Sequence, residues 1–421
     1  MNCIRTAMKD LTTPRTRKKR SAVYNPYARF YTKEDKEHFE SLTSSDQKSI
    51  VDSENFVHDH NPLSIPIRFK ILNSKHSVDI KNMAISKLNQ LQTSNGDNLK
   101  SMQWITSLFE VPVGIYKQLD VSASSNPLQI KEFITNTSKN LDDKVFGHAD
   151  AKQQIMRLLF QWISKPNSKG MTIGIQGPMG CGKTTLVKNG ICSSISIPFS
   201  FIPLGGAFGS EFLDGHSFTY EGSTWGKVVQ SLIDSKCMNP VIFFDELDKV
   251  SETPKGVEII NYLVHLTDSS QNDKVYDKYF AQVPLDLSKA LIIFSYNNEE
   301  SINPILRDRM FKIKTKGYTA SEKIILFKDY LMPEILMDFA FKKNDIIFTD
   351  CIIKYLVDNL EKEQGVRNLK RALLEIIGQI NLKNLMEEDF KLPHTVTQQD
   401  IKEYVKSNPK SENTSLSHMY I

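Results

Sequence analysis

The alternation of apolar and polar stretches along the chain predicts a parallel β-sheet covered by helices. Four short runs are almost entirely apolar and are separated by stretches with helical spacing; the runs are residues 171–176, 199–203, 241–245 and 290–295. Strands that are apolar throughout are typically buried on both faces, as happens when crossover helices join parallel strands. The pattern therefore predicts the α/β fold class, with a doubly wound parallel sheet over residues 141–315.

Helical periodicity dominates the stretch before this sheet. Apolar residues recur at helical spacing from Val78 to Leu91, and Trp104 to Phe109 places a second apolar group on one helix face. A segment rich in proline and glycine, Val111 to Tyr116, interrupts the pattern. We expect residues 61–140 to form a short helical domain ahead of the sheet.

The pattern after the sheet is also helical. Thr319 and Glu322 have the spacing of a capping box, which marks the start of a helix. A later helix is predicted to begin near Gly365, because apolar residues from Leu369 to Ile380 recur on one face. Residues 316–404 are therefore expected to form an all-α lid domain.

The two ends of the chain are polar. Residues 1–33 contain nine Lys or Arg against one acid, a charge of +8, so that the net charge of +4 leaves −4 for the remainder. We expect residues 1–60 to be a disordered basic arm and residues 405–421 a disordered tail. The cluster Arg15–Arg20 is typical of a nuclear-localisation signal, a nucleic-acid-binding patch or a solvated tail.

Cysteine content and hydropathy limit the compartment. The five cysteines are scattered without a C-x-x-C pair, which favours reduced thiols in the cytoplasm or nucleus. No apolar stretch approaches the roughly 18 residues that a membrane-spanning helix needs, and the N-terminus lacks a signal-peptide core. We therefore expect a cytoplasmic protein without membrane contact, with a nuclear location as the alternative.

Residues 177–184 match G-x-x-x-x-G-K-[ST], the pattern of a phosphate-binding loop between a strand and a helix. Its glycines allow backbone N–H groups to converge on phosphate oxygens, and the following helix contributes the positive end of its dipole. Lys183 is predicted to contact the β- and γ-phosphates of a nucleoside triphosphate, and the Thr184 hydroxyl to bind Mg²⁺. The predicted cofactor-binding residues are Gly177, Pro178, Met179, Gly180, Cys181, Gly182, Lys183, Thr184 and Thr185, with Phe146 and Gly147 from the turn before a long amphipathic helix.

Polar residues follow two of the predicted strands. Asp245 and Glu246 end the strand VIFFD, and Asn297 follows the strand LIIFSY. Ligands of doubly wound sheets bind at the carboxyl ends of the strands. We expect Asp245 to support Mg²⁺ together with Thr184, Glu246 to polarise the attacking water, and Asn297 to orient that water.

Two arginines could take part in the same chemistry. Arg309 lies in LRDRM, and a guanidinium suits the charge on a transferring phosphoryl group; the alternative is a structural arginine. If Arg309 acts on a neighbouring subunit's nucleotide, the protein must form a ring. Arg367, in the first turn of a lid helix, could report the γ-phosphate to the lid.

A glycine-flanked loop contains an aromatic residue that the nucleotide chemistry does not need. Tyr220, Glu221 and Gly222 lie in this loop, between the second predicted strand and the strand that ends at Asp245. The tyrosine could grip a threaded polypeptide, or it could be an ordinary packed side chain.

From about residue 63 to residue 404, the chain resembles the Lon branch of the AAA+ ATPases. The segments that carry the resemblance include VFGHADAKQQI, GPMGCGKTTLVK, NPVIFFDELDK, LRDRM and EQGVRNLKRAL. The resemblance implies that residues 177–184 are the Walker A loop, Asp245 and Glu246 the Walker B pair, Asn297 sensor 1, Arg309 the arginine finger, Arg367 sensor 2 and Tyr220 the pore-loop aromatic. It also implies ATP, Mg²⁺, a homohexameric ring and a threaded protein substrate.

The chain departs from the Lon pattern at three places. The Ser-Lys peptidase domain of the family would follow the lid, where 17 residues remain, so peptidase activity is not expected. The basic arm stands where the family has a large N-terminal substrate domain. Glu221 stands where the family has an aliphatic partner to the tyrosine.

The sequence thus predicts a Mg²⁺-dependent ATPase that unfolds or remodels protein substrates. One alternative is an ATPase that acts on nucleic acid or nucleoprotein through residues 1–33. Another is an ATP-gated scaffold or ATPase partner of a separate protease.

Overall fold

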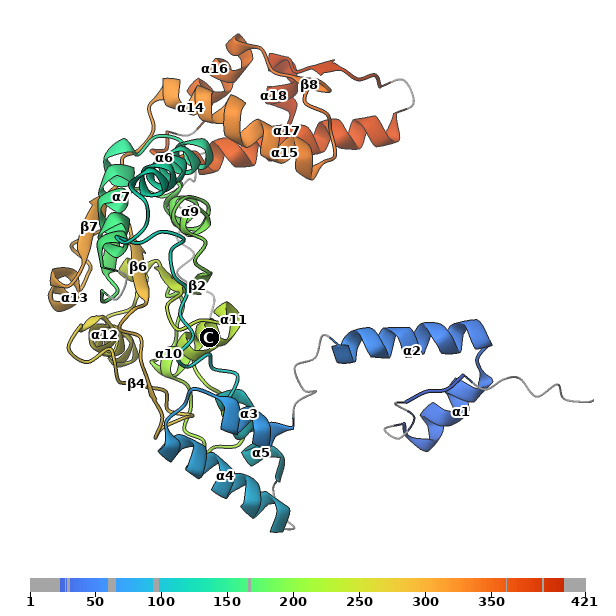
Figure 1. Ribbon diagram of the computed structural model, residues 1–421. Helices are drawn as coiled ribbons and strands as arrows, with labels where there is room; N and C mark the ends of the chain where they lie inside the picture. Colours follow the sequence, from blue (N-terminus) through green and yellow to red (C-terminus); the bar gives the residue numbers. More distant parts are fainter. Residues whose placement is uncertain are drawn as a thin grey trace, which may run out of the picture. The chain divides into compact units, whose positions relative to one another are not determined.

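The computed structural model describes residues 23–26, 28, 31–59, 66–93, 98–165, 168–360, 362–387 and 390–404. The Arg15–Arg20 cluster and the predicted tail at 405–421 lie outside these residues. The chain divides into two compact units, residues 1–109 and residues 110–421. Figure 1 shows the helices and strands of both. None of the helices in the described part of the chain is long and apolar enough to cross a membrane.

The described part of the first unit is helical. Its elements are α1 (Lys33–Ser41), α2 (Ser44–Asp59), α3 (Ile67–Asn73), α4 (Val78–Thr93) and α5 (Asn98–Leu108). The apolar face predicted for α5 is buried, since Trp104, Ile105, Leu108 and Phe109 are at most 7% exposed. The helical pattern before the sheet therefore packs as the spacing predicts.

Residues 33–59 form two helices, whereas the sequence analysis expects a disordered arm as far as residue 60. A capping box starts α1: Thr32 accepts from the backbone of Asp35, whose carboxylate accepts from the Thr32 backbone. The Tyr31 hydroxyl also donates to Glu54 of α2 at 2.7 Å. The capping box and the bond from Tyr31 to Glu54 stabilise this segment, although its low hydrophobicity alone predicts disorder.

The second unit contains a five-stranded parallel sheet. Its strands are β1 (Thr172–Gln176), β2 (Phe199–Pro203), β3 (Val241–Asp245), β6 (Leu291–Tyr296) and β7 (Phe311–Lys314), in the spatial order β2-β3-β6-β1-β7. The pairing is parallel throughout, with Gly174 of β1 opposite Phe294 of β6 and Lys312 of β7. The predicted α/β class with a doubly wound parallel sheet is confirmed.

Helices and short segments accompany the sheet. They are α6 (Pro127–Lys144), α7 (Ala149–Ser164), α8 (Lys183–Thr185), the π-helix η3 (Leu186–Cys192), α9 (Ser193–Ile195), α10 (Glu211–Asp214), α11 (Lys227–Ser235), the 3₁₀ turn η4 (Leu247–Lys249), α12 (Pro254–Thr267) and α13 (Pro304–Asp308), with the hairpin strands β4 (Val275–Tyr276) and β5 (Pro284–Leu285). Apolar residues of α7 and η3 join those of β1, β3, β6 and β7 in one core. This core fixes the positions of the strand ends.

The structure places the start of the sheet-containing unit earlier than residue 141. Helix α6 runs through that position, and the close contacts of Gly190 in η3 are with Leu141 and Val145, at the end of this helix. The segment from Glu110 onward therefore belongs to the second unit. The proline and glycine residues at 112–114, rather than a change in periodicity, mark the division.

The C-terminal helices have their own core. They are α14 (Ala320–Leu326), the π-helix η5 (Phe327–Leu331), α15 (Met332–Asp338), α16 (Asp350–Asn359), α17 (Arg367–Met386) and α18 (Gln398–Tyr404), with the short strands β8 (Ile346–Ile347) and β9 (His394–Thr395). The predicted capping box at Thr319 and Glu322 is present. The apolar face predicted for α17 is buried in this second core, which makes the region a separately packed group of helices (Figure 1).

Candidate functional site

The predicted phosphate loop connects β1 to α8. Gly180 and Gly182 have φ values of +72° and +83°, which residues other than glycine rarely adopt. At Gly177, a Cβ atom would lie 1.9 Å from the Thr315 hydroxyl oxygen. The glycines of the motif are therefore required by the geometry of the turn and by its approach to the strand beside it.

Lys183 and Asn297 meet across the end of the sheet. The Lys183 ammonium donates to the Asn297 Oδ1 at 2.7 Å and to the carbonyls of Gly177 and Pro178 at 2.7 and 3.1 Å. Burial lowers the pKa of Lys183, while the nearby carboxylates of Asp245 and Glu246 act in the opposite direction. The structure thus brings together two residues that are 114 positions apart in the chain.

Asp245 and Glu246 lie at the end of β3, next to β6. The Asp245 Oδ1 accepts bonds from the Ser295 hydroxyl and from the Glu246 backbone at 3.1 Å. Glu246 is in the left-handed region, with φ of +59°, and its carboxylate lies over Gly205, where a Cβ would be 2.2 Å from Oε2. Ser295 was not predicted, although a hydroxyl in an otherwise apolar strand was a usable signal.

The start of α17 packs directly on the phosphate loop. The Val366 backbone donates to the Gly180 carbonyl at 3.1 Å, and a Cβ on Gly180 would lie 3.0 Å from the Arg367 Cβ. A Cβ on Gly365 would lie 2.2 Å from the Met179 carbonyl oxygen. Arg367 therefore lies beside the loop, and two glycines in backbone contact make this approach possible.

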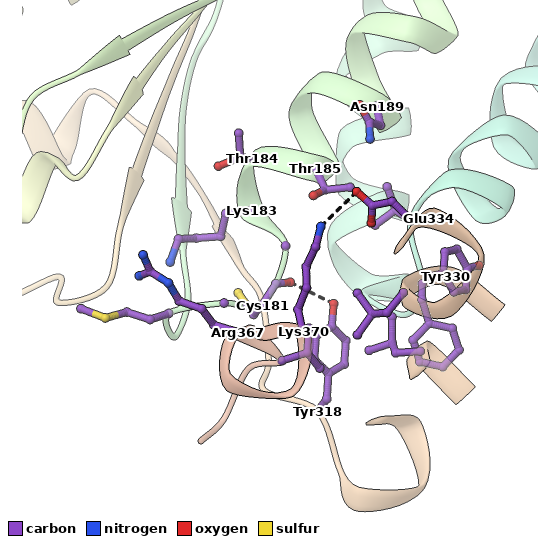
Figure 2. A pocket seen from close by; sticks show the side chains of 18 of the residues that line it. Cys181, Lys183, Thr184, Thr185, Asn189, Tyr318, Tyr330, Glu334, Arg367 and Lys370 are labelled. Atoms are coloured by element: carbon purple, nitrogen blue, oxygen red, sulfur yellow. Dashed lines mark hydrogen bonds and ion pairs between the residues drawn. The ribbon is translucent and has the colours of Figure 1, made fainter. Parts of the chain in front are cut away.

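These residues surround one cavity of about 730 Å³, within the size range of small-molecule sites (Figure 2). Its polar part contains the loop residues Met179 to Thr185, with Asp245, Glu246, Asn297 and Arg367. Apolar and aromatic residues also line it; they are Val145, Phe146, Leu326, Tyr330, Leu331, Val366 and Leu374. A ligand with a charged phosphate end and a flat apolar end matches this lining.

Tyr318 and Lys370 line the cavity and His148 lies behind it, and none of the three is predicted from the sequence. The Tyr318 hydroxyl donates to the Cys181 carbonyl at 2.9 Å (Figure 2). The His148 Nε2 lies 2.8 Å from the same oxygen. Burial lowers the pKa of His148, which favours the neutral ring. Lys370 pairs with Glu334 at 3.0 Å across the lid side of the cavity. No local pattern indicated these contacts, because each joins residues distant in the chain.

Gly147 takes part indirectly. It has φ of +70°, and a Cβ there would lie 3.6 Å from the Tyr318 ring. The neighbouring Phe146 ring contacts both Tyr318 and Tyr330, at centroid distances of 6.3 and 5.9 Å. Phe146 lines the cavity, whereas Gly147 shapes the turn beneath it.

Arg309 is not among the residues that line the cavity. Its guanidinium donates to the Val264 carbonyl in the last turn of α12 and pairs with the Asp268 carboxylate at 2.9 Å. Hydrogen bonds from Ser270, together with the Arg309 charge, lower the pKa of Asp268. Arg309 therefore lies outside the cavity formed by its own chain, held against the end of α12.

The Tyr220 loop is also separate from the cavity lining. The Tyr220 side chain is 68% exposed, Glu221 is exposed, and Gly222 has φ of +71°. Backbone bonds from Tyr220 to Ser217 and from Ser223 to Tyr220, at 3.1 and 3.4 Å, form the turns at its tip. The loop thus presents the aromatic ring to solvent.

The comparisons with known proteins agree with this geometry. A family model described as ATPase family associated with various cellular activities (AAA) matches residues 173–318. The chain is 37% identical over 330 residues to a Lon protease homolog of Acanthamoeba polyphaga mimivirus, which covers 76% of this chain and 32% of that relative. It is 32% identical over 322 residues to a Lon protease of Helicobacter pylori (75% and 38%), and 29% identical over 342 residues to one of Malacoplasma penetrans (81% and 42%).

The chain spans between 32% and 42% of the length of these relatives, so the match concerns a part of each of them. The residues matched by the family model include the phosphate loop, both acids at the end of β3, Asn297 and Arg309. Residues 173–318 therefore form an AAA-type ATPase region, and the chain is similar to a part of Lon proteases.

Proposed function

We propose that this chain hydrolyses ATP with Mg²⁺ in a homohexameric ring, and that hydrolysis unfolds or remodels protein substrates. One observation carries the proposal: Lys183, Asp245, Glu246, Asn297 and Arg367 line a single cavity, while Arg309 lies outside it. The first five residues supply the groups for binding and hydrolysis. The sixth would complete the site only from a second copy of the chain.

The roles follow from charge and position. Lys183 is proposed to exchange its bonds to Asn297 and the loop carbonyls for phosphate oxygens, which frees the Asn297 amide to orient the attacking water. Glu246 is proposed to polarise that water, because it lines the same cavity. Arg367 would contact the γ-phosphate from the lid side, which makes lid position sensitive to hydrolysis.

The donor set fits Mg²⁺. The Thr184 hydroxyl and the Asp245 carboxylate both line the cavity, and the bonds from Ser295 and Glu246 use only the Oδ1 of Asp245. Mg²⁺ prefers oxygen ligands and usually binds through one or two protein groups together with substrate phosphates. When bound, it neutralises negative charge on the phosphates.

Protein remodelling is proposed from the Tyr220 loop. An exposed aromatic ring on a loop of the same unit could contact an unfolded polypeptide while the ATPase module changes conformation. Glu221 beside it would favour segments that carry basic residues over purely apolar ones. The named activity of the relatives, Lon protease, is consistent with a polypeptide substrate.

The ATPase part is tested with Glu246→Gln, and Glu252→Gln, an exposed acid six positions on, is the control. Since a positioned general base typically contributes about 10²–10⁴-fold, phosphate release should fall by at least about 10² in Glu246→Gln and stay unchanged in the control. Binding of a fluorescent ATP analogue should be retained in both. Unchanged phosphate release in Glu246→Gln would refute the assigned role.

The remodelling part is tested with Tyr220→Ala against Phe208→Ala, since Phe208 is another exposed aromatic residue, 84% accessible. The readout is ATP-dependent loss of fluorescence from a green fluorescent protein with a disordered basic extension. We expect Tyr220→Ala to abolish this loss while basal ATP hydrolysis stays within about twofold, because Tyr220 lies outside the cavity. Equal unfolding by the wild type and Tyr220→Ala would exclude threading by this loop.

A further inference from the structure

The loop that carries Tyr220 leaves and re-enters the fold through a narrow base. The His216 backbone donates to the Thr224 carbonyl at 3.0 Å, which closes the base. A Cβ on Gly215 would lie 2.8 Å from the Gly226 nitrogen and 2.9 Å from the Thr224 oxygen. The two ends of the loop are therefore in backbone contact, and only glycine fits at this point.

A buried carboxylate lies beneath this base. Asp277, which follows β4, is 3% exposed. Its Oδ2 accepts from the Gly226 backbone at 2.8 Å, and its Oδ1 accepts from the Tyr279 backbone at 2.8 Å. A Cβ on Gly215 would lie 2.9 Å from Oδ1, so the carboxylate touches both ends of the loop.

The next residue holds the other end of the loop. The Lys278 backbone donates to the Asp214 carbonyl at 2.6 Å, and its ammonium pairs with the Asp214 carboxylate at 3.1 Å. The same ammonium donates to the Ser210 hydroxyl at 3.0 Å. Asp214 is the last residue of α10, directly before Gly215, so Lys278 fixes the incoming end and Asp277 the outgoing one.

Two aromatic side chains of the loop pack on the residues that follow. Phe218 and Trp225 both meet Tyr279 edge to face, with centroid distances of 5.6 and 5.7 Å. Trp225 also stacks on Phe280 at 6.2 Å. Tyr279 and Phe280 are themselves buried, at 1% and 0% exposed. The loop therefore turns two aromatic rings inward and leaves Tyr220 outward.

We infer that residues 277–280, the turn between β4 and β5, form a positioning platform that holds the Tyr220 loop rigid. This inference rests on the proposed function, because it assigns the platform to the loop proposed to grip polypeptide. Each end of the loop is fixed by a separate residue, and the inward rings fix its middle. A loop held in this way moves the Tyr220 ring together with the ATPase module, whereas an unsupported loop would bend and leave the ring in place.

The platform is tested by hydrogen exchange of the loop amides, because exchange reports local opening. Asp277→Ala removes both acceptors at the base. We expect the amides of residues 215–226 to exchange at least about tenfold faster, since the buried N–H groups of Gly226 and Tyr279 lose their acceptors. Asp273→Ala, an exposed acid just before the same hairpin, is the matched control and should leave exchange unchanged.

The second readout is ATP hydrolysis together with unfolding of the fluorescent probe. Basal ATP hydrolysis by Asp277→Ala should stay within about twofold, because the platform is outside the cavity, while unfolding of the fluorescent probe should fall to the level of Tyr220→Ala. A merely structural role would instead lower ATP hydrolysis and unfolding together. That result, or unchanged exchange in the loop, would overturn the inference.

If Asp277→Ala does not fold, Lys278→Gln tests whether residues 277–280 hold the loop. The Lys278 side chain is 43% exposed, and its backbone bond to Asp214 remains in the variant. We expect about threefold faster exchange, confined to the incoming end of the loop, since partly exposed ion pairs contribute little. If Tyr220→Ala leaves probe unfolding intact, the proposed function fails, and the exchange data still decide whether the platform holds the loop.

Discussion

The cavity and the two sites outside it differ in how their polar groups are held. In the cavity, Lys183 donates to Asn297 and to loop carbonyls, so these acceptors can be exchanged for those of a ligand. Outside it, Arg309 is fixed by the end of α12, and the Tyr220 loop by residues 277–280. Under the proposed function, the first kind of group binds the nucleotide and the second kind acts on a partner.

The largest effect is expected from Arg309→Ala. If Arg309 completes a neighbouring subunit's site, ATP hydrolysis should fall by about 10³-fold or more, the lower end of the range for arginine fingers, with ATP binding retained. Arg307→Ala, in the last turn of α13 just before Arg309, is the control. Phosphate release and binding of a fluorescent ATP analogue measure the two effects.

Mixing experiments show whether the arginine acts between subunits. Arg309→Ala and Lys183→Ala each lack a different part of a shared site, so an equimolar mixture should recover part of the activity that both lack alone. No recovery in the mixture, with a full loss in Arg309→Ala, would indicate that Arg309 only supports α12 of its own chain.

The raised pKa of the buried Asp277 carboxyl predicts that the protein becomes less stable as the pH rises. Burial raises the pKa of Asp277 to about 7, and the charge of Asp214 acts in the same direction, while the backbone bonds from Gly226 and Tyr279 oppose it. The folded protein therefore holds a proton between about pH 4 and pH 7 that the unfolded chain releases. The free energy of unfolding should fall as pH rises through this range, by about 4 kcal/mol at most.

Asp277→Asn isolates that contribution. The titratable groups that interact with Asp277 are Asp214, Tyr262 and Tyr279, and they are retained in the variant. Urea unfolding followed by the fluorescence of Trp225, which packs on Tyr279, should show a larger loss of stability from pH 5 to pH 8 in the wild type than in Asp277→Asn. Parallel curves for the two proteins would contradict the buried, protonated carboxyl.

The sequence predicted the cavity better than its surroundings because the cavity depends on local patterns. A glycine-rich loop, a strand that ends in two acids and an apolar strand before Asn297 each have a signature within ten residues or so. The sheet then places the three side by side, since parallel strands end at one edge. The acids and Asn297 could therefore be assigned to one site before the structure was known.

The contacts that the sequence did not predict all join distant residues. Tyr318 and His148 meet at the Cys181 carbonyl, and Asp277 meets Gly226 across 51 positions. Periodicity carries no information about such pairs. Helices α1 and α2 were missed for another reason: capping bonds stabilise them, whereas the disorder prediction considered only apolar surface.

Gly365→Ala, which separates the lid from the phosphate loop, is expected to have a smaller effect than Arg309→Ala or the pH dependence due to Asp277. A methyl group there would lie 2.2 Å from the Met179 carbonyl, so the start of α17 must move and take Arg367 with it. Overpacking of this kind costs about 1–3 kcal/mol, which predicts roughly tenfold weaker ATP binding with the fold intact. Gly378→Ala, inside the same helix, is the control, because its methyl group would meet only the Phe339 ring at 3.8 Å. Isothermal titration with a non-hydrolysable ATP analogue measures both variants. Equal affinity in both would show that the lid contact at Gly180 is dispensable for binding, and that the cavity is formed by the sheet-side residues alone.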